Sequence, residues 1–470
     1  MMRKRIAVIG AGPCGLFQLI ALKNDDVDLI CFERQSEWGG MWFYTEESKT
    51  STSEEPVHTS MYKQLWSNGP KELVECVDYT FDEHFGHSTP SYQPRSVVYD
   101  YLVGRAERND IRKYIRFQTA VRHVNNEEGN KFRVTVEDLK TKTREDLIFD
   151  YVIVAPGRYA TPNIPQFEGM SQFSGHVLHS KYFHDASQFV HQHVLIIGSS
   201  YSAEDIALQL YKFGASTITI SYRTKPLGYK WPDERIKEVP LLIRFQDRFA
   251  YFRDGTKSDH EIDSVIFCTG YIHDYPFMAE HLRLDCQTKV LSPPNLYKGI
   301  IWSKHPNLAY LGMQSLVFQF TMFDIQASFV RDVILGHVTL PDVEIMDQDI
   351  EQWKEREKKL EHGNGKSEFY YQINYMQDLL TQCHSPPQFD INRVILGVEE
   401  LVKHKIDNVF TYRDHTFASI VTGKKEFHGN INKSWLNNFA DAKEEFFSTI
   451  TLANDNTVDD EEPDIKDVIQ

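Results

Sequence analysis

Ile6-Ala7-Val8-Ile9-Gly10-Ala11-Gly12-Pro13-Cys14-Gly15 is the stretch that decides the fold of this chain. A short apolar run ends in a Gly-x-Gly-x-x-Gly loop, and residues 13–23 then place apolar side chains at helical spacing. A second apolar run over residues 29–32 ends at Glu33. A glycine turn in an unrelated α/β domain would not need this acid. The order therefore predicts a βαβ unit whose helix N-terminus holds a pyrophosphate and whose Glu33 accepts hydrogen bonds from a ribose diol.

The same pattern recurs over residues 193–223, but a base ends it. The loop is Gly198-Ser199-Ser200-Tyr201-Ser202-Ala203, a helical segment follows as far as Gly214, and the next apolar run ends at Arg223-Thr224. Serine and alanine replace the second and third glycines; the alanine is tolerated, and the serine hydroxyl can bind a phosphate. A guanidinium accommodates a 2′-phosphate, which a carboxylate repels. The two loops predict one nucleotide with a free ribose and one NADP(H), a pairing that suggests a flavin reduced by NADPH.

Two further apolar runs, residues 151–155 and 265–268, end in Pro-Gly and Thr-Gly and flank the second loop. We interpret them as the crossings between two domains. The predicted fold is α/β, with two dinucleotide-binding (Rossmann-like) domains and the NADP domain inserted into a discontinuous FAD domain. The expected divisions are an FAD-binding domain over residues 1–165 and 277–450, the second part with a C-terminal helical region, an NADP-binding domain over 166–276, and an acidic, disordered tail over 451–470.

The composition is ordinary for a soluble globular protein and disfavours several classes of function. The chain has 470 residues, of which 41% are hydrophobic and 25% charged, and its net charge of −16 argues against nucleic acid as a partner. No run of about 18 apolar residues and no secretion signal is visible, so we expect no transmembrane segment and a cytoplasmic location. The six cysteines form no C-x-x-C pair, and His84 and His87 have no third and fourth ligand nearby, so we expect no metal.

A third motif lies between the two loops and carries a family resemblance. Residues 173–183 read FSGHVLHSKYF and fit F-x-G-x-x-x-H-x-x-x-(F/Y), the identifying motif of the flavin-containing monooxygenases. The runs at 38–42, 65–72 and 269–271 resemble the same family, and those at 198–205, 228–232 and 322–324 resemble its soluble bacterial branch, which contains the trimethylamine monooxygenases. The resemblance extends from residue 5 to about 425.

The resemblance implies an NADPH- and O₂-dependent flavin monooxygenase that oxygenates soft nitrogen or sulfur nucleophiles. In that mechanism NADPH reduces FAD, reduced flavin and O₂ form a C4a-hydroperoxide, and bound NADP⁺ protects it until an amine or sulfide attacks the distal oxygen. The family also suggests a homodimer. Two alternatives stay open. One is Baeyer–Villiger oxygenation of ketones, whose fingerprint has Trp at Phe183. The other is an electron-transfer reductase that serves a protein partner.

The resemblance also implies site residues. Asn68 matches the active-site Asn beside the flavin, and Tyr201 matches a Tyr that faces NADP and the substrate cavity. By themselves the residues also fit a simple turn at 67–70 and simple packing of Tyr201. In addition to the two loops, Glu33, Arg223 and Thr224, the implied cofactor contacts are Arg34, Gln35, Gly40, Met41, Trp42, Trp66, Ser67, Val121, Gln314 and Arg413.

Some positions depart from the family pattern. After the run 312–314, trimethylamine monooxygenases usually have Asp and, two residues later, Trp, where this chain has Ser315 and Val317. We therefore expect a more apolar and roomier substrate pocket. Pro156 replaces the usual Thr or Ser at the end of the first crossing and removes a backbone donor there. The motif histidine, His179, is expected to hydrogen-bond the hinge between the domains, with proton transfer as the alternative.

Overall fold

The first predicted βαβ unit lies at the centre of a seven-stranded sheet. The computed structural model describes residues 3–45, 59–286, 290–315, 319–360 and 365–452. The sheet order is β17 (Leu296–Tyr297), β18 (Ile301–Trp302), β19 (Leu308–Tyr310), β7 (Tyr151–Val154), β1 (Lys4–Ile9), β2 (Val27–Phe32) and β3 (Ile115–Arg116). β18 runs antiparallel to both of its neighbours, and the other pairs are parallel.

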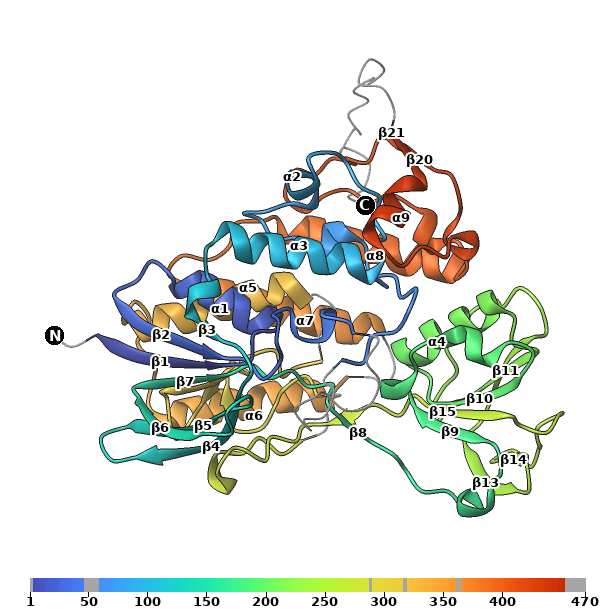
Figure 1. The fold of residues 1–470 in the computed structure, drawn as a ribbon, viewed down its shortest axis with the longest axis horizontal. Helices are drawn as coiled ribbons and strands as arrows, with labels where there is room; N and C mark the ends of the chain where they lie inside the picture. Colours follow the sequence, from blue (N-terminus) through green and yellow to red (C-terminus); the bar gives the residue numbers. More distant parts are fainter. Residues whose placement is uncertain (1–2, 46–58, 287–289, 316–318, 361–364, 453–470) are drawn as a thin grey trace.

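Alternate side chains of β1 enter two different cores, because successive residues of a strand face opposite sides of its sheet. Ile6 and Val8 pack with the helices, whereas Ala7 and Ile9 pack with an antiparallel sheet. Helices α1 (Pro13–Leu22) and α5 (Gln319–Leu335) cover the first face, and β4 (Thr119–Glu127), β5 (Lys131–Asp138) and β6 (Arg144–Phe149) cover the second (Figure 1). We call this sheet and its covering layers the first lobe.

A second, parallel sheet forms the second lobe. Its order is β12 (Ile236–Val239), β11 (Thr217–Ser221), β10 (His193–Ile197), β15 (Ser264–Phe267) and β9 (His176–His179). Val194 and Ile196 of β10 face α4 (Tyr201–Phe213), and Leu195 and Ile197 face the hairpin β13 (Leu242–Gln246) and β14 (Phe249–Phe252). As predicted, α4 ends at Gly214, which adopts the left-handed conformation.

The second lobe lies in sequence between β7 and β17 of the first, so the chain crosses between the lobes twice. The crossings pair with each other as β8 (Thr161–Pro162) and β16 (Tyr271–Ile272), antiparallel and between the two sheets (Figure 1). Two Rossmann-like sheets with one inserted in the sequence of the other confirm the predicted fold class.

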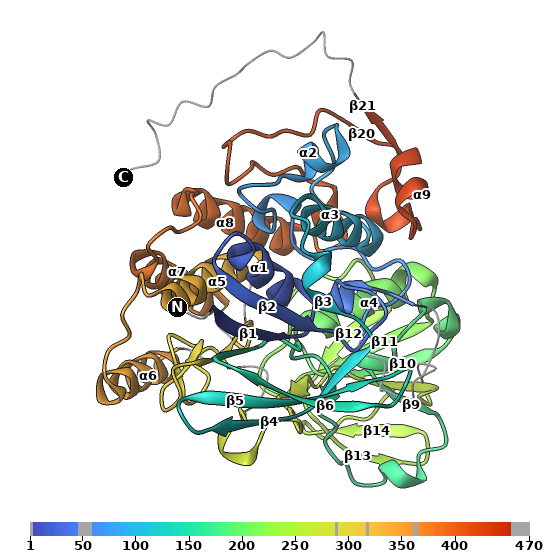
Figure 2. The ribbon, with the colours of Figure 1, turned by 60° about the vertical axis from the view of Figure 1, so that its left-hand side comes forward.

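The remaining helices and strands belong to a layer above the first lobe and to its flank (Figure 2). They are α2 (Phe81–Phe85), α3 (Arg95–Arg108), α6 (Val343–Lys358), α7 (Gly365–Gln382), α8 (Ile391–Asp407), α9 (Lys443–Ser448), β20 (Gly429–Ile431) and β21 (Ile450–Leu452). β21 contains residues 451 and 452 of the expected tail, and residues 453–470 lie outside the described part. Among the described helices, none is long and apolar enough to cross a membrane.

Candidate active site

The two glycine loops have the same geometry at the carboxyl ends of their sheets. Gly10 has φ +99°, and a Cβ there would lie 2.6 Å from the carbonyl oxygen of Ala155. Gly198 has φ +119°, and a Cβ there would overlap the carbonyl oxygen of Cys268. Both turns therefore require glycine. In parallel sheets of this kind, ligands bind outside the carboxyl ends of the strands, where these loops lie.

The first loop fits a flavin nucleotide. Gly12 is the N-cap of α1 and provides no side-chain cap, so the first N–H groups of the helix are open to an anion. Gly12, Pro13 and Cys14 are partly exposed. A Cβ on Gly40 would lie 2.8 Å from the Cα of Gly12, so the backbone segments at these two glycines lie close together. They form a narrow cradle that side chains would fill. Gly15 is buried beneath the turn.

Glu33 lies beside this cradle as an almost buried carboxylate. It is 6% exposed and accepts hydrogen bonds from the N–H groups of Ala11 (2.6 Å) and Gln35 (2.7 Å). Burial raises the pKa of its carboxyl, and the two backbone bonds oppose that rise. Each oxygen keeps a lone pair for a ribose hydroxyl. Arg34, another of the predicted cofactor contacts, is the next residue in the chain.

Other predicted flavin contacts lie near the same cradle. Gly40, Met41 and Trp42 form one 3₁₀ turn, Gly40–Trp42, and the Trp42 ring meets Phe320 of α5 edge-on at 6.1 Å. Val121 is half-buried in β4, at a point where the register of that strand shifts. Their contacts with the cofactor remain predictions.

The second loop presents three exposed side chains at the start of α4. Ser200 is the N-cap, yet its side chain makes no capping bond. Ser200, Tyr201 and Ser202 are exposed, and Ala203 is fully buried. The hydroxyls and the first helical N–H groups can therefore bind a phosphate.

Three cations gather where β11 ends. The three cations are Arg223, Lys225 and Arg253. Arg223, Thr224 and Lys225 are exposed. The Ser199 hydroxyl donates to the carbonyl of Lys225 (3.0 Å), and the Arg253 guanidinium donates to that of Arg223 (2.6 Å). Within the described residues, no carboxylate pairs with Arg223, Lys225 or Arg253. An unpaired cationic cluster in a chain of net charge −16 indicates an anionic ligand. Sequence reasoning missed Arg253, because only the hairpin β13–β14 brings it here.

Asn68 is exposed on a turn whose neighbours are fixed. The Trp66 indole, 1% exposed, donates to the carbonyl of Ala440 (3.2 Å). The Ser67 N–H donates to the carbonyl of Gln93 (2.8 Å). The Asn68 side chain makes no hydrogen bond with a described residue. Its amide is thus positioned and available for a bound molecule.

Tyr201, at the start of α4, lies near α7 and α8. It is 57% exposed, and the Lys405 ammonium lies 5.6 Å from its ring centroid. Desolvation of its hydroxyl, followed by the carboxylates of Glu204 and of Glu368 in α7, raises the pKa of Tyr201 to about 12. A phenol is protonated at neutral pH even at its ordinary pKa of about 10, so Tyr201 can donate a hydrogen bond.

Arg413 joins the Asn68 turn to α4. Its Nε donates to the carbonyl of Ser67 (3.0 Å), and a terminal nitrogen pairs with Asp205 (2.5 Å), one helical turn after Tyr201. The side chain is 1% exposed, and its other terminal nitrogen has no partner among the described residues. Arg413 thus brings the two candidate catalytic residues to one junction. Its predicted contact with NADP remains a prediction.

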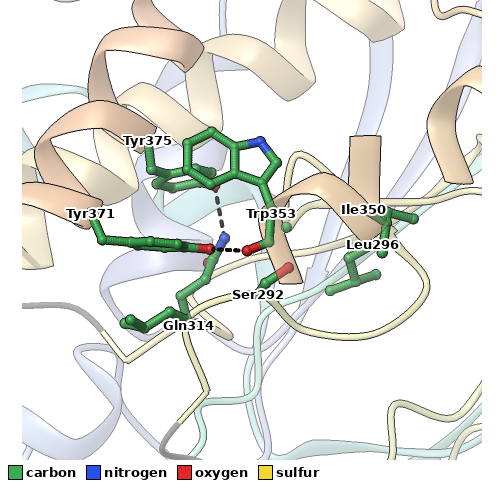
Figure 3. Close-up of a pocket in the computed structure, with 9 residues that line it drawn as sticks. Ser292, Leu296, Gln314, Ile350, Trp353, Tyr371 and Tyr375 are labelled. Carbon is green, nitrogen blue, oxygen red and sulfur yellow. Dashed lines mark hydrogen bonds between the residues drawn. The ribbon is translucent and has the colours of Figure 1, made fainter. Parts of the chain in front are cut away.

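The Gln314 side chain is turned into the interior (Figure 3). Its amide nitrogen donates to the Tyr375 hydroxyl (2.8 Å), and its oxygen accepts from Gln326 (2.9 Å). It borders a small cavity of about 10 Å³, the room of one water molecule. Its backbone carbonyl accepts from Arg158. Both polar atoms of the Gln314 side chain are therefore engaged, so the predicted flavin contact at this residue would have to come from its backbone.

The residues that depart from the family pattern lie near this segment. Ser315 is half-buried, and its N–H donates to the carbonyl of Val290 (2.7 Å). Val317 lies outside the described residues. Pro156 lies against Gly10, its Cα 3.1 Å from where a Cβ of that glycine would be. The expected shape of the pocket remains a prediction.

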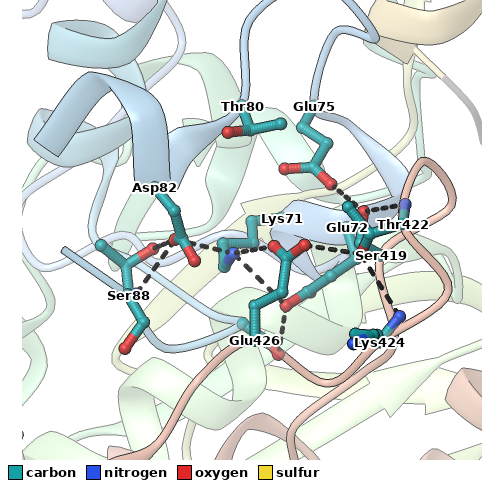
Figure 4. Close-up of polar contacts among 12 residues, drawn as sticks. Lys71, Glu72, Glu75, Thr80, Asp82, Ser88, Ser419, Thr422, Lys424 and Glu426 are labelled. Carbon is teal, nitrogen blue, oxygen red and sulfur yellow. Dashed lines mark hydrogen bonds and ion pairs between the residues drawn. The ribbon is translucent and has the colours of Figure 1, made fainter. Parts of the chain in front are cut away.

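Buried ionisable groups follow the Asn68 turn closely in the sequence and pair with one another (Figure 4). The Lys71 ammonium lies 3.1 Å from Asp82 and 3.7 Å from Glu72. Glu75 accepts from the Ser419 hydroxyl (2.8 Å). Burial raises the pKa of Glu72 to about 7 and that of Glu75 to about 8. This cluster joins residues near the turn to the C-terminal segment.

His179 is a hinge residue, as predicted. Its Nδ1 accepts the N–H of Lys181 (3.1 Å), which leaves Nε2 protonated to donate to the carbonyl of Gly270 (2.9 Å) at the second crossing. Burial lowers the pKa of His179 to about 4. A neutral imidazole with both nitrogens engaged is not a proton-transfer group.

The groups that resemble metal ligands have protein partners. His84 bonds the Tyr79 hydroxyl (2.7 Å) and Asp100 (2.9 Å). Cys76, Asp78 and Asp324 lie within 4.8 Å of one another. The Arg105 guanidinium binds both carboxylates, at 2.7 and 2.9 Å, and occupies the place of a cation.

Comparison with known proteins identifies the family. Residues 3–231 and 233–401 match the model of the flavin-binding monooxygenase-like proteins. The chain belongs to this family. It is 47% identical over 428 residues to the trimethylamine monooxygenase of Methylocella silvestris, an alignment that covers 90% of this chain and 93% of that relative.

Solved structures agree with this membership. Tmm from Pelagibacter sp. superposes with a TM-score of 0.88 at 40% identity, covering 94% of this chain and all of that one. S-allyl-L-cysteine S-oxygenase from Allium sativum superposes with a TM-score of 0.76 at 25% identity, covering 88% of this chain and 95% of that one. The protein is therefore a flavin-dependent monooxygenase. These relatives favour neither the Baeyer–Villiger nor the electron-transfer alternative.

Proposed function

We propose that the protein is an FAD-containing, NADPH- and O₂-dependent monooxygenase that converts small tertiary amines to N-oxides and sulfides to S-oxides. The observation that carries this proposal is the contrast between two loops of equal geometry. Glu33 follows the first loop. At the end of β11, the strand that follows the second loop, lie the unpaired cations Arg223, Lys225 and Arg253. A carboxylate suits the free ribose of FAD, and the cations suit the 2′-phosphate of NADPH.

The proposed division follows the two lobes. Residues 1–165 and 277–450 would hold FAD, with its pyrophosphate at the N-terminus of α1. Residues 166–276 would hold NADPH, with its pyrophosphate at Ser200, Ser202 and the N-terminus of α4. We also propose a homodimer, as the family resemblance suggests. Light scattering of the purified protein would measure its mass.

The bound flavin, reduced by NADPH, would supply the oxygen-activating chemistry. The protein positions donors around it. The Asn68 amide donates hydrogen bonds without giving up a proton, and the Tyr201 phenol, which is protonated at neutral pH, does the same. Arg413 keeps the two on one junction.

A substrate panel tests the proposal. Trimethylamine comes first, because the relative that is 47% identical carries that name. Bulkier tertiary amines and thioethers follow, because Ser315 stands where an Asp is usual. The expected result is yellow protein whose NADPH oxidation matches N-oxide or S-oxide formation measured by mass. Colourless protein that releases no flavin on denaturation would contradict the proposal.

A further inference from the structure

Arg158 is a buried cation that faces no carboxylate. It is 7% exposed. One terminal nitrogen donates to the carbonyl of Gln314 and the other to the Tyr159 hydroxyl (2.6 Å). In the described part of the chain, no Asp or Glu lies within ion-pair distance of it. Two neutral acceptors do not balance the charge of a guanidinium.

The other buried cations of the described chain show how unusual this is. Six of them face a carboxylate: Lys71, Arg95, Arg105, Lys298, Lys405 and Arg413. Lys181 faces no carboxylate among the described residues, but burial lowers its pKa, and an ammonium can give up its proton. Arginine stays charged in proteins. An unpaired buried charge is costly, so the counter-charge of Arg158 must come from a ligand.

The position of Arg158 shows which ligand this is. It follows β7 by four residues, at the carboxyl edge of the first sheet. A Cβ on Gly312 would lie 2.5 Å from the sulfur of Cys14 in the first glycine loop, and the charge of Arg158 opposes the rise in the pKa of that thiol. It binds the backbone of Gln314, two residues after Gly312. All three features place it at the proposed flavin site and away from the cationic cluster of the second lobe.

We propose that Arg158 provides the counter-charge for the reduced flavin. Hydride transfer adds two electrons and one proton to the isoalloxazine ring and leaves a negative charge on its N1–C2=O edge. A guanidinium held near that edge in the loaded enzyme would stabilise the reduced form more than the neutral oxidised form. Arg158 thereby raises the midpoint potential and favours reduction by NADPH. The inference rests on the proposed flavin site.

The decisive measurement is the midpoint potential of the bound flavin, taken by spectroelectrochemistry on purified holoprotein. Arg158→Met should weaken binding of the reduced flavin, relative to the oxidised, by about tenfold or more, which lowers the potential by ~30 mV or more for a two-electron couple. Arg158→Lys keeps the charge and should stay near the wild-type value. Arg144→Met, which removes an exposed cation from β6 of the same lobe, is the control.

Three outcomes would overturn the inference. The first is a midpoint potential of the flavin in Arg158→Met that equals the wild-type value. Equal weakening of oxidised and reduced flavin would assign Arg158 to the pyrophosphate instead. If the Met variant held no flavin, the wild type would decide: its reduced flavin should remain anionic, by absorbance, one pH unit below the ionisation of free reduced flavin, and a neutral form there would refute the proposal. Wild-type protein without flavin would instead contradict the proposed function.

Discussion

At the scale of single residues, the two nucleotide sites differ in charge and hardly in shape. Gly10 and Gly198 make the same turn against a neighbouring carbonyl. The choice of nucleotide therefore falls to Glu33 and to Arg223 with Arg253. A charge-assisted hydrogen bond contributes about 1.5–3 kcal/mol, enough for one side chain to set a preference.

Arg223→Ala should raise the KM for NADPH about tenfold to hundredfold, because it removes such a bond to the 2′-phosphate. The KM for NADH, which lacks that phosphate, should hardly change. Arg253→Ala should act in the same direction and more weakly. Steady-state kinetics with both nucleotides measures the ratio, and Arg244→Ala, another cation of the second lobe, is the control. An equal change for NADPH and NADH would contradict the assignment.

Asn68→Ala should retain flavin reduction by NADPH but lose most oxygenated product, and so should Asn68→Asp, which replaces a donor by an acceptor. Rapid-reaction spectra separate the reductive half-reaction from product formation. The exposed turn residue bonds no described neighbour, so both variants should keep the wild-type melting temperature. Product formation at the wild-type rate would refute the role of Asn68.

At the scale of elements, α4 is the part that joins the lobes. Its residues bond the first lobe and the C-terminal layer through Asp205–Arg413 (2.5 Å), Glu204–Lys405 (2.7 Å) and the Gln209 amide to the carbonyl of Gln64 (2.9 Å). All of these contacts lie within three turns of the proposed phosphate site. The position of the second nucleotide therefore depends on bonds that its own lobe does not contain.

Arg413→Ala should lower the free energy of unfolding by about 3–5 kcal/mol, because it leaves Asp205 without its partner in a buried place. It should also lower activity more than flavin content, since the Ser67 carbonyl loses its donor. Denaturant unfolding and flavin absorbance measure the two effects. Lys354→Ala, which breaks an exposed pair with Glu351, should cost below ~1 kcal/mol. A loss for Arg413→Ala as small as for that control would contradict the buried pairing.

At the scale of the whole molecule, a buried charge cluster connects distant parts of the chain. Glu75 is fully buried, and the groups that face it are Lys71, Glu72, Ser419 and Glu426. Its pKa, about 8 in the folded protein, exceeds the ordinary value of 4.5. The folded state therefore binds the proton more tightly than the unfolded state, and stability is lost as pH rises from about 4.5 through 8.

Glu75→Gln should remove part of this pH dependence, because the amide is neutral and its oxygen still accepts from Ser419. At pH 5 the variant and the wild type should melt at similar temperatures. At pH 8.5 the variant should be more stable by ~2 kcal/mol. Thermal unfolding across this range measures the difference. A constant difference at every pH would show that Glu75 does not titrate in the folded protein.

Much of the fold follows from local patterns. The apolar runs before Gly10 and Gly198 are strands, the segments after them are helices, and Gly214 ends the second helix. The hinge role of His179 was also predictable from its place between the loops. The positions of Arg253 and Arg158 were not predictable from the sequence, because neither residue belongs to a motif. The hairpin β13–β14 brings Arg253 to the end of β11, and the end of β7 brings Arg158 to Gln314.

By itself, the sequence determined the two βαβ units, their order and the charge that follows each loop, because these depend on residues adjacent along the chain. Only the tertiary structure decided that Ser67 and Asp205 share Arg413, that Gln314 turns inward, and that Arg158 is buried without a carboxylate. These features depend on packing between segments that lie apart along the chain, from 61 residues between Gln314 and Tyr375 to 346 residues between Ser67 and Arg413. Such contacts leave no local pattern, since only the folded chain sets which charges lose their water and which find a partner.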